Sequence, residues 1–415
     1  MSDILPASLY EIPLITDLPR FPFARPPQEL VRPPLLPPDA DTGQRVSRVA
    51  LPTGSWAWLV TGHEDVRQML RSPAFSANMN RPGFPLLRPL PQLSEQRRAG
   101  SFIRMDPPDH TLYRRILTPE FMIKNMRRLE PLIAQTVSDA LDQLGRAGPP
   151  ADLIGLFALP VPSIVICQLL GVPYADHDFF EQHSRTLLNR GSTVERTSQA
   201  AQELREYLHR LIVVKQAEGP TDDLLGRLAV ERLATGEITS DELVGIALLL
   251  LVAGHETTAN MIGLSTLVLL RHPEQFTALR DDPTIAGAAV EELLRYLTIV
   301  RTGLPRLATE DVEIGGQLIR AGEGAIAMLA AANRDDAVFD RPDEFDIERG
   351  SHQHVAFGFG VHQCIGQPLA RAELRIALVE LVSRFPRLRL AIEPTEIEMR
   401  DDSVVFGVQR LPVAW

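Results

Sequence analysis

Residues 357–366 read Phe-Gly-Phe-Gly-Val-His-Gln-Cys-Ile-Gly and place one cysteine, Cys364, in a glycine-rich loop. Glycine lets a backbone turn sharply and approach another group closely. A helical pattern starts directly afterwards, at about Gln367. A thiolate in front of a helix is favoured by the helix dipole and by the free N–H groups of the first turn. The loop therefore meets the needs of a haem-thiolate site, where the sulfur must stay deprotonated while it binds iron.

The only other cysteine, Cys167, stands inside the apolar run Val-Ile-Cys-Gln-Leu-Leu and is expected to be a buried core residue. Two cysteines exclude a disulfide framework and fit a reducing cytoplasm. The first residues carry acids rather than a basic region, so we expect no secretory signal.

The composition is that of a globular protein rather than of a nucleic-acid-binding or membrane protein. Of the 415 residues, 45% are hydrophobic and 23% charged, and the net charge is −11. The apolar run 243–253 is interrupted by His255 and Glu256. Because a membrane span needs about 20 apolar residues, we expect a buried helix here.

The predicted secondary structure changes along the chain. Ten prolines in residues 1–40 predict an irregular N-terminal arm. A short hairpin is expected over 45–61, and a long loop over 76–103. Helices follow from 109 to 270, and the last of them is long: Thr239 and Glu242 form a capping box at its start, and Pro273 marks its end. Strands are expected at 312–319, 324–329 and 404–409, and a final helix at 367–384.

The cysteine loop resembles that of the cytochrome P450 family. The family pattern Phe-x-x-Gly-x-x-x-Cys-x-Gly is matched by Phe357, Gly360, Cys364 and Gly366. The resemblance covers nearly the whole chain and is closest to the soluble bacterial branch of actinomycete type. It implies a mainly α fold with minor β, a triangular prism with a long central helix and small β-sheets. It also implies one catalytic domain over residues 1–415, although length alone would allow two or three.

A second family motif, Glu-x-x-Arg, is matched by Glu292 and Arg295, whose spacing puts both charges on one helix face. In the family this pair stabilises the segment before the haem loop with a third residue, often an arginine. Glu344 stands where many relatives have that arginine, so we expect Arg349 to take the role, with Arg341 as the alternative.

The central helix carries Ala253-Gly-His-Glu-Thr257, an acid followed by an alcohol in an apolar helix. Burying an acid is costly without a purpose, and a helical threonine can bond to the preceding turn and bend the helix. The resemblance implies that Glu256 relays protons and that Thr257 assists oxygen activation. It also implies that Ala253 and Gly254 leave room for oxygen over the haem.

The expected cofactor is haem b, with Cys364 as the iron ligand. Propionates require cations or hydrogen-bond donors. The resemblance assigns haem contacts to a set of residues from three parts of the chain: His110, Arg114, Arg306, His362, and the loop residues Phe357, Gly358 and Gly366.

The implied activity is a cytoplasmic, monomeric monooxygenase that hydroxylates or epoxidises a hydrophobic small molecule. The chain has no residues to spare for a fused reductase. Electrons are therefore expected from a ferredoxin and its reductase, and Arg114, Arg115 and Arg371 are the docking candidates for this acidic partner. Nucleic acid and membrane are not expected partners.

The substrate stays open among polyketides, terpenoids, peptides and xenobiotics. Candidate pocket residues are Leu249, Val300, Val405 and Phe406, and Arg301 either meets an acid or carbonyl there or is exposed. Two other functions also stay open. One is a peroxide-driven haem-thiolate enzyme, against which the Glu256–Thr257 pair argues; the other is a haem-binding sensor without turnover. A thiol hydrolase built on Cys364 is a more distant alternative.

Overall fold

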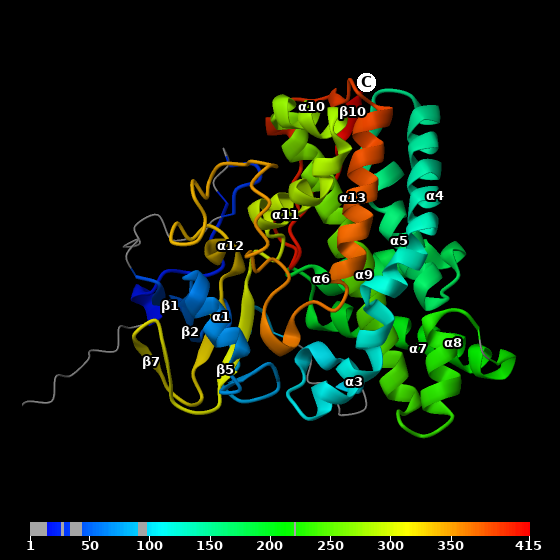
Figure 1. Ribbon diagram of the computed structural model, residues 1–415. Helices are drawn as coiled ribbons and strands as arrows, with labels where there is room; N and C mark the ends of the chain where they lie inside the picture. Colours follow the sequence, from blue (N-terminus) through cyan, green and yellow to red (C-terminus); the bar gives the residue numbers. More distant parts are fainter. Residues whose placement is uncertain (1–14, 26–28, 34–43, 90–97, 220) are drawn as a thin grey trace, which may run out of the picture.

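The computed structural model describes the chain except residues 1–14, 26–28, 34–43, 90–97 and 220. Helices dominate one side and small sheets the other (Figure 1). The α-helices are α1 (His63–Arg71), α3 (Asp109–Leu117), α4 (Ile123–Ala147), α5 (Pro160–Leu170), α6 (His177–Leu188), α7 (Val194–Glu218), α8 (Leu224–Leu228), α9 (Ser240–Arg271), α10 (Pro273–Asp281), α11 (Ala286–Leu297), α12 (Leu329–Ala332) and α13 (Gln367–Arg384).

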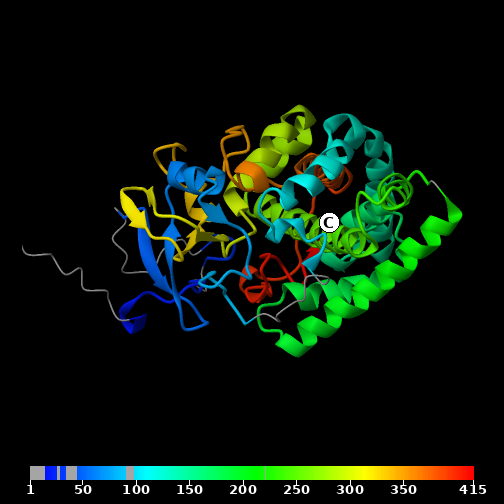
Figure 2. The same ribbon diagram turned by 90° about the horizontal axis from the view of Figure 1, so that it is seen from below.

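The long central helix is α9, and its start agrees with the prediction. Thr239 is the N-cap, its side chain accepts from the amide of Glu242, and the Glu242 carboxylate accepts from the amide of Thr239. By length and hydropathy α9 alone among the described helices could cross a membrane, but 61% of its most apolar window is buried by protein. It packs against α5, α7 and α13, while α7 lies along the outside of the helical half (Figure 2). The helix is therefore the core of the helical half, as expected.

The main sheet joins distant parts of the chain in the order β1-β2-β8-β5-β3. The expected hairpin forms from β1 (Val46–Ala50) and β2 (Trp56–Val60), which pair antiparallel. Strand β2 then runs parallel to β8 (Gly324–Ala327), and β8 pairs antiparallel with β5 (Leu304–Ala308). Strand β3 (Phe75–Ser76) forms the other edge. The predicted strand at 312–319 is a hairpin of β6 (Val312–Ile314) and β7 (Gln317–Ile319).

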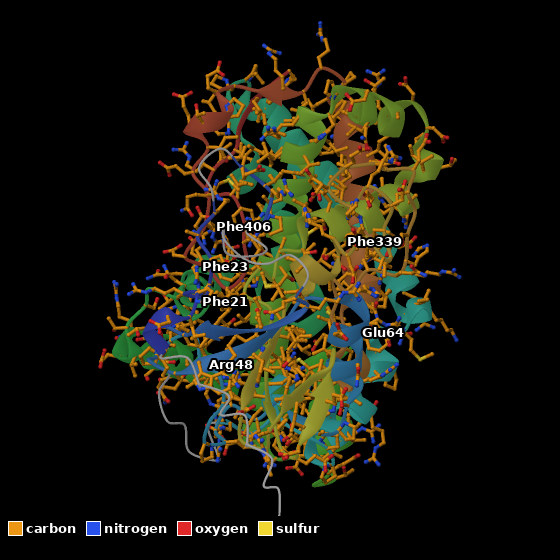
Figure 3. All side chains as sticks on the ribbon, turned by 90° about the vertical axis from the view of Figure 1, so that its left-hand side faces the viewer. Phe21, Phe23, Arg48, Glu64, Phe339 and Phe406 are labelled. Atoms are coloured by element: carbon orange, nitrogen blue, oxygen red, sulfur yellow. The ribbon has the colours of Figure 1, made fainter. Side chains whose placement is uncertain are left out.

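The side chains of Phe21, Phe23 and Arg48 lie at the sheet end of the molecule (Figure 3). Phe21 packs edge-on against Phe23 with ring centroids 5.3 Å apart. The guanidinium of Arg48 lies over Trp56 and Trp58, at 4.9 and 4.6 Å from the ring centroids. The amide of Phe21 donates to the carbonyl of Ala50 at 2.9 Å, and the Phe21 side chain belongs to a hydrophobic cluster with residues of β1, β2 and β8, so the described part of the N-terminal arm is attached to the main sheet.

The segment between α12 and the cysteine loop has little regular structure, and a buried polar network holds it. The Arg295 guanidinium binds both carboxylate oxygens of Glu292 at 2.7 Å, and neither side chain has exposed surface. Arg295 also donates to the carbonyl of Asn333, whose side-chain oxygen accepts from the amide of Val355 at 2.7 Å. Arg349 lies 3.2 Å from Glu292, whereas Arg341 is exposed and pairs with Glu344. The structure thus places Arg349, and not the alternative Arg341, beside Glu292.

The strand predicted at 404–409 is wrong. Its amides bond to three different places: Val404 to the carbonyl of Leu188, Phe406 to that of Ile299, and Gln409 to that of Glu398. Only an isolated bridge forms, because no single neighbouring strand runs beside the segment. The sequence reading also missed a small sheet in which β10 (Pro412–Ala414) pairs with β4 (Ala151–Asp152) and β9 (Arg389–Leu390).

Candidate active site

The cysteine loop turns tightly and returns to its own start. Gly358 and Gly360 have φ of +71° and +73°, which only glycine adopts without strain. A Cβ on Gly360 would lie 2.4 Å from the carbonyl oxygen of Leu70, so the loop also packs closely on α1. The amide of Cys364 donates to the carbonyl of Phe357 at 2.9 Å. Helix α13 then starts at Gln367, as predicted.

The Cys364 thiol is accessible, although the residue is enclosed by protein, so it faces an interior space. Burial raises the pKa of this thiol. The backbone N–H groups of Gly366 and Gln367 act in the opposite direction by hydrogen bonding to the sulfur. The charges of Arg114 and Arg371 also favour the thiolate. A sulfur with two amide donors and two nearby cations has the environment of a metal-binding thiolate.

Four of the predicted haem contacts, two arginines and two histidines, gather beside this loop. The His110 and His362 rings lie with centroids 4.1 Å apart and planes tilted by 48°, and Arg114 donates to the carbonyl of Gln363, next to Cys364. Burial, with the charges of Arg306, His110 and Arg114, lowers the pKa of His362 to about 3.

The group has donors to spare. His110 Nε2 is buried without a hydrogen-bond partner among the described residues. Arg306 is buried, which lowers its pKa to about 10, and its guanidinium donates to the carbonyl of Pro305. Within the described residues neither Arg114 nor Arg306 hydrogen-bonds a carboxylate, so these buried donors fit the two propionates of a haem. The residues present therefore fit this cofactor.

On α9, Ala253 is exposed although most of its neighbours are buried, so it borders an interior space. Thr257, four residues later on the same face, is half-buried and donates to the carbonyl of Ala253 at 2.7 Å. A Cβ on Gly254 would lie 2.7 Å from Ile166, so this glycine allows α5 to pack closely on α9 rather than opening the interior space. The expected bend does not interrupt α9, which stays α-helical throughout.

Glu256 has no exposed surface and is held by ion pairs. Arg400 Nη1 donates to Glu256 Oε2 at 2.8 Å, and Arg185 Nε of α6 lies 3.7 Å from Oε1. Asn260 donates to the Glu256 carbonyl. Oε1 has no hydrogen-bond partner among the described residues. One oxygen of this carboxylate is thus held by Arg400, and the other lies near Arg185 without a hydrogen bond from the described residues.

The four pocket candidates belong to one hydrophobic cluster, in which Val405 and Phe406 are buried and Leu249 and Val300 partly buried. Arg301 is not a surface residue. Its guanidinium donates to the carbonyl of Val31 and lies 3.1 Å from the centroid of the Phe406 ring. It therefore points toward the N-terminal arm on the far side of Phe406.

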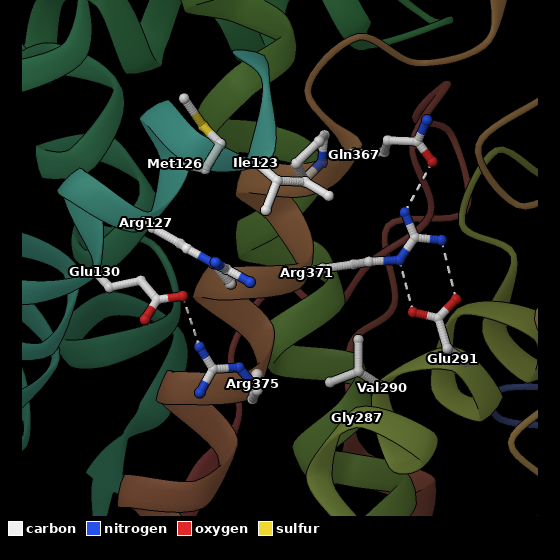
Figure 4. Close-up of a pocket in the computed structure, with 12 residues that line it drawn as sticks. Ile123, Met126, Arg127, Glu130, Gly287, Val290, Glu291, Gln367, Arg371 and Arg375 are labelled. Carbon is white, nitrogen blue, oxygen red and sulfur yellow. Dashed lines mark hydrogen bonds and ion pairs between the residues drawn. The ribbon is translucent and has the colours of Figure 1, made fainter.

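The docking candidates differ from one another in accessibility. The Arg115 side chain is 71% exposed. Arg371 instead forms an ion pair with Glu291, with 2.6 Å between Nε and Oε1. Arg371 borders a surface groove between α4, α11 and α13 that Ile123, Arg127 and Arg375 also line (Figure 4). Arg371 is therefore part of the groove wall rather than a free cation.

Three polar residues near the site were missed: Glu291, Arg400 and Glu373. Arg400 lies far from Glu256 in sequence and on an irregular loop, so no spacing could indicate it. Glu373 stands inside a helix and is only 2% exposed. A glutamate in a helix is usually exposed, so its residue type did not indicate that it is buried. Glu291 directly precedes the Glu-x-x-Arg motif and is the one that sequence reading could have considered.

A thiolate loop that leads into a helix, placed with a cationic group and a long helix carrying an acid and an alcohol, defines a haem-thiolate protein. Comparison with known proteins agrees: the cytochrome P450 family profile matches residues 53–413, and the chain belongs to this family. It is an oxidoreductase, a monooxygenase of the bacterial actinomycete type.

Relatives match over almost their whole length. The chain is 48% identical over 380 residues to cytochrome P450-SU2 of Streptomyces griseolus, covering 91% of this chain and 92% of the relative. It is 46% identical over 409 residues to vitamin D3 dihydroxylase of the same organism, covering 97% and 98%. Among solved structures, the mycinamicin VIII C21 methyl hydroxylase of Micromonospora griseorubida matches with a TM-score of 0.85 and 42% identity, covering 90% of this chain and 94% of that one.

Glu373 predicts a pH dependence of stability. Burial raises its pKa to about 8, although a hydrogen bond with Thr258 opposes the shift. The folded protein therefore keeps a proton between roughly pH 4.5 and 8 that the unfolded chain releases, so this residue makes stability fall as pH rises through that window. Glu373→Gln should be more stable relative to the wild type at pH 8 than at pH 5, by up to about 1.4 kcal/mol per pH unit.

Urea unfolding of both proteins at several pH values measures this difference. Glu380→Gln, an exposed residue of the same helix, is the matched control and should show a constant difference. A Glu373→Gln difference that does not change with pH would contradict the assignment.

Proposed function

We propose that the protein inserts one oxygen atom from O2 into a C–H or C=C bond of a hydrophobic small molecule, with haem b bound by Cys364. The observation that carries the proposal is the enclosed Cys364 thiol with its amide and arginine neighbours. We place the enzyme in the cytoplasm, as a monomeric catalytic domain, with electrons from a ferredoxin and its reductase.

The substrate class is a secondary metabolite or a xenobiotic of largely apolar character. The candidate pocket residues Leu249, Val300, Val405 and Phe406 all belong to the hydrophobic core, which suits such a ligand. Relatives of similar length are named as a vitamin D3 dihydroxylase, a pentalenic acid synthase and a 20-oxo-5-O-mycaminosyltylactone 23-monooxygenase. These names support a polycyclic or macrocyclic substrate.

Each side chain of the site has a defined task. The bound haem supplies the oxygen-activating chemistry, and Cys364 donates electron density to its iron. Arg114, Arg306 and the His110–His362 pair orient the propionates. Thr257 presents its hydroxyl at the interior space beside Ala253.

Glu256 supplies protons through Oε1, because Oε2 is fixed by Arg400. A carboxylate held at one oxygen keeps its position, and its other oxygen stays open to a hydrogen-bonding partner. The ion pair with Arg400 therefore fixes the orientation of the Glu256 carboxylate and leaves Oε1 without a hydrogen-bond partner from the described residues.

Cys364→Ser should abolish the thiolate-type carbon monoxide spectrum of the reduced protein, because an alcohol does not replace the thiolate as a strong donor. The measurement is the difference spectrum of the purified protein with and without carbon monoxide. Cys167→Ser, at the buried cysteine of α5, is the control and should keep the spectrum. A thiolate spectrum in Cys364→Ser would end the proposal.

Thr257→Ala should keep the haem and its spectrum but release most of the reducing equivalents as hydrogen peroxide, because the hydroxyl at Ala253 is lost. Comparing NADH consumed, peroxide formed and product formed measures this coupling. Thr266→Ala removes a similar hydroxyl on α9, bonded to the carbonyl of Ile262, and should stay coupled. Equal coupling in the wild type and Thr257→Ala would refute the role.

The ferredoxin is expected to dock on cations around Arg115 and the groove of Figure 4. Arg115→Glu and Arg127→Glu, both at exposed side chains, should slow reduction about threefold to tenfold at low salt, because charge reversal at an interface rim lowers association rates. Stopped-flow reduction over a range of salt concentrations measures this. Arg320→Glu, an exposed cation beside β7, is the control, and equal slowing in all three variants would argue against this docking surface.

A further inference from the structure

Glu291 directly precedes Glu292 on α11 but binds different partners. Its side chain is buried, and its two oxygens accept from Arg371 Nε at 2.6 Å and Nη2 at 2.9 Å. Figure 4 shows this two-point contact at the wall of the groove, with Gln367 bound to the remaining end of Arg371 at 2.8 Å. Such a fork leaves the guanidinium little freedom to rotate.

The fixed guanidinium lies over the first aromatic ring of the cysteine loop, with its carbon 4.7 Å from the Phe357 ring centroid. The carbonyl of the same residue accepts from the amide of Cys364. A cation over an aromatic face is an attractive contact, worth about 0.5–2 kcal/mol. Glu291 is therefore connected to the cysteine through Arg371 and Phe357.

A second connection runs through His354. Its Nε2 lies 2.9 Å from Glu291 Oε2, while its Nδ1 accepts from the amide of Ala356 at 3.2 Å. One ring nitrogen thus faces an amide donor and the other faces the carboxylate. Glu291 therefore binds residues on both sides of the cysteine loop, His354 before it and Arg371 after it.

The carboxylate also balances charge near the sulfur. Burial alone would raise the pKa of Glu291, but hydrogen bonds from His354 and Arg371 and the charge of Arg371 lower it to about 2. The residue is therefore ionised at any working pH. Arg371 favours the Cys364 thiolate, and the Glu291 charge partly offsets that effect.

We propose that Glu291 is a positioning residue that sets the reduction potential of the bound iron through Arg371, Phe357 and the cysteine loop. The inference rests on the proposed function, since it requires Cys364 to be the iron ligand. A cation beside the sulfur stabilises the reduced iron, and its carboxylate partner weakens that stabilisation.

The test is a potentiometric titration of the haem-loaded protein with Glu291→Gln, Arg371→Gln and the double variant. Glu291→Gln should raise the midpoint potential because Arg371 loses its counter-charge, and Arg371→Gln should lower it. We expect each change to be about tenfold in the reduction equilibrium, which is about 59 mV for one electron. The double variant should return close to the wild type, since both charges are gone.

Three controls separate charge from structure. Arg371→Lys keeps the charge and should leave the potential nearly unchanged, which keeps the idea testable if Glu291→Gln fails to bind haem. Glu130→Gln breaks the Arg375–Glu130 pair on the same groove, at 3.0 Å, and should not shift the potential. Each variant should keep the thiolate carbon monoxide spectrum.

Shifts of the same sign in Glu291→Gln and Arg371→Gln, or no shift in either, would overturn the inference. A wild-type protein without the thiolate spectrum would instead overturn the proposed function. The two failures are therefore told apart by the wild-type spectrum alone.

Discussion

The Glu292–Arg295 ion pair is the contact on which the position of the cysteine loop depends. Removing two charges from water is costly unless the remaining hydrogen bonds are also made. Here the guanidinium reaches the carbonyls of Asn333, Pro342 and Glu344, all in a segment with little secondary structure. The Asn333 side chain then binds the amide of Val355, two residues before the loop. This segment has no regular backbone hydrogen bonding of its own. Its shape is therefore set by the hydrogen bonds that it makes to the Arg295 guanidinium.

The site itself has an opposite balance of charge. Arg114 and Arg306 gather with His110 and His362, burial lowers the pKa of both histidines, and Asp106 is the acid that acts on His110 and Arg306. A cluster of buried cations is unfavourable until anions enter it. The propionates of a haem would supply those anions, so cofactor binding would contribute to the stability of this region as well as to the reaction. The Glu292–Arg295 ion pair on α11 holds the cysteine loop in position. The carboxylates of the cofactor would then balance the positive charge beside that loop.

Sequence patterns predicted what depends on local order. The capping box at Thr239 and the start of the last helix at Gln367 are determined by residues close together in the sequence. Both predictions agree with the structure. The family motifs also placed Arg349 near Glu292, although the residue type expected at 344 was absent. Local order was not sufficient for residues 404–409, whose run of valines and a phenylalanine looks like a strand but whose amides bond to three separate parts of the chain. The pattern shows which side chains are apolar, and tertiary contacts decide what the backbone pairs with.

Arg400 shows the same limit at the site, and it joins two features that the sequence kept apart. It stands on the irregular C-terminal segment that also presents Val405 and Phe406, yet its guanidinium holds the carboxylate of Glu256. Arg185 approaches the same carboxylate from α6, whose last residue, Leu188, pairs with the amide of Val404. The wall of the candidate pocket and the counter-charges of Glu256 are therefore one structure. A change that moves this wall to admit a larger substrate also moves the charges that hold Glu256, so under the proposed relay role substrate fit and proton supply would not be independent.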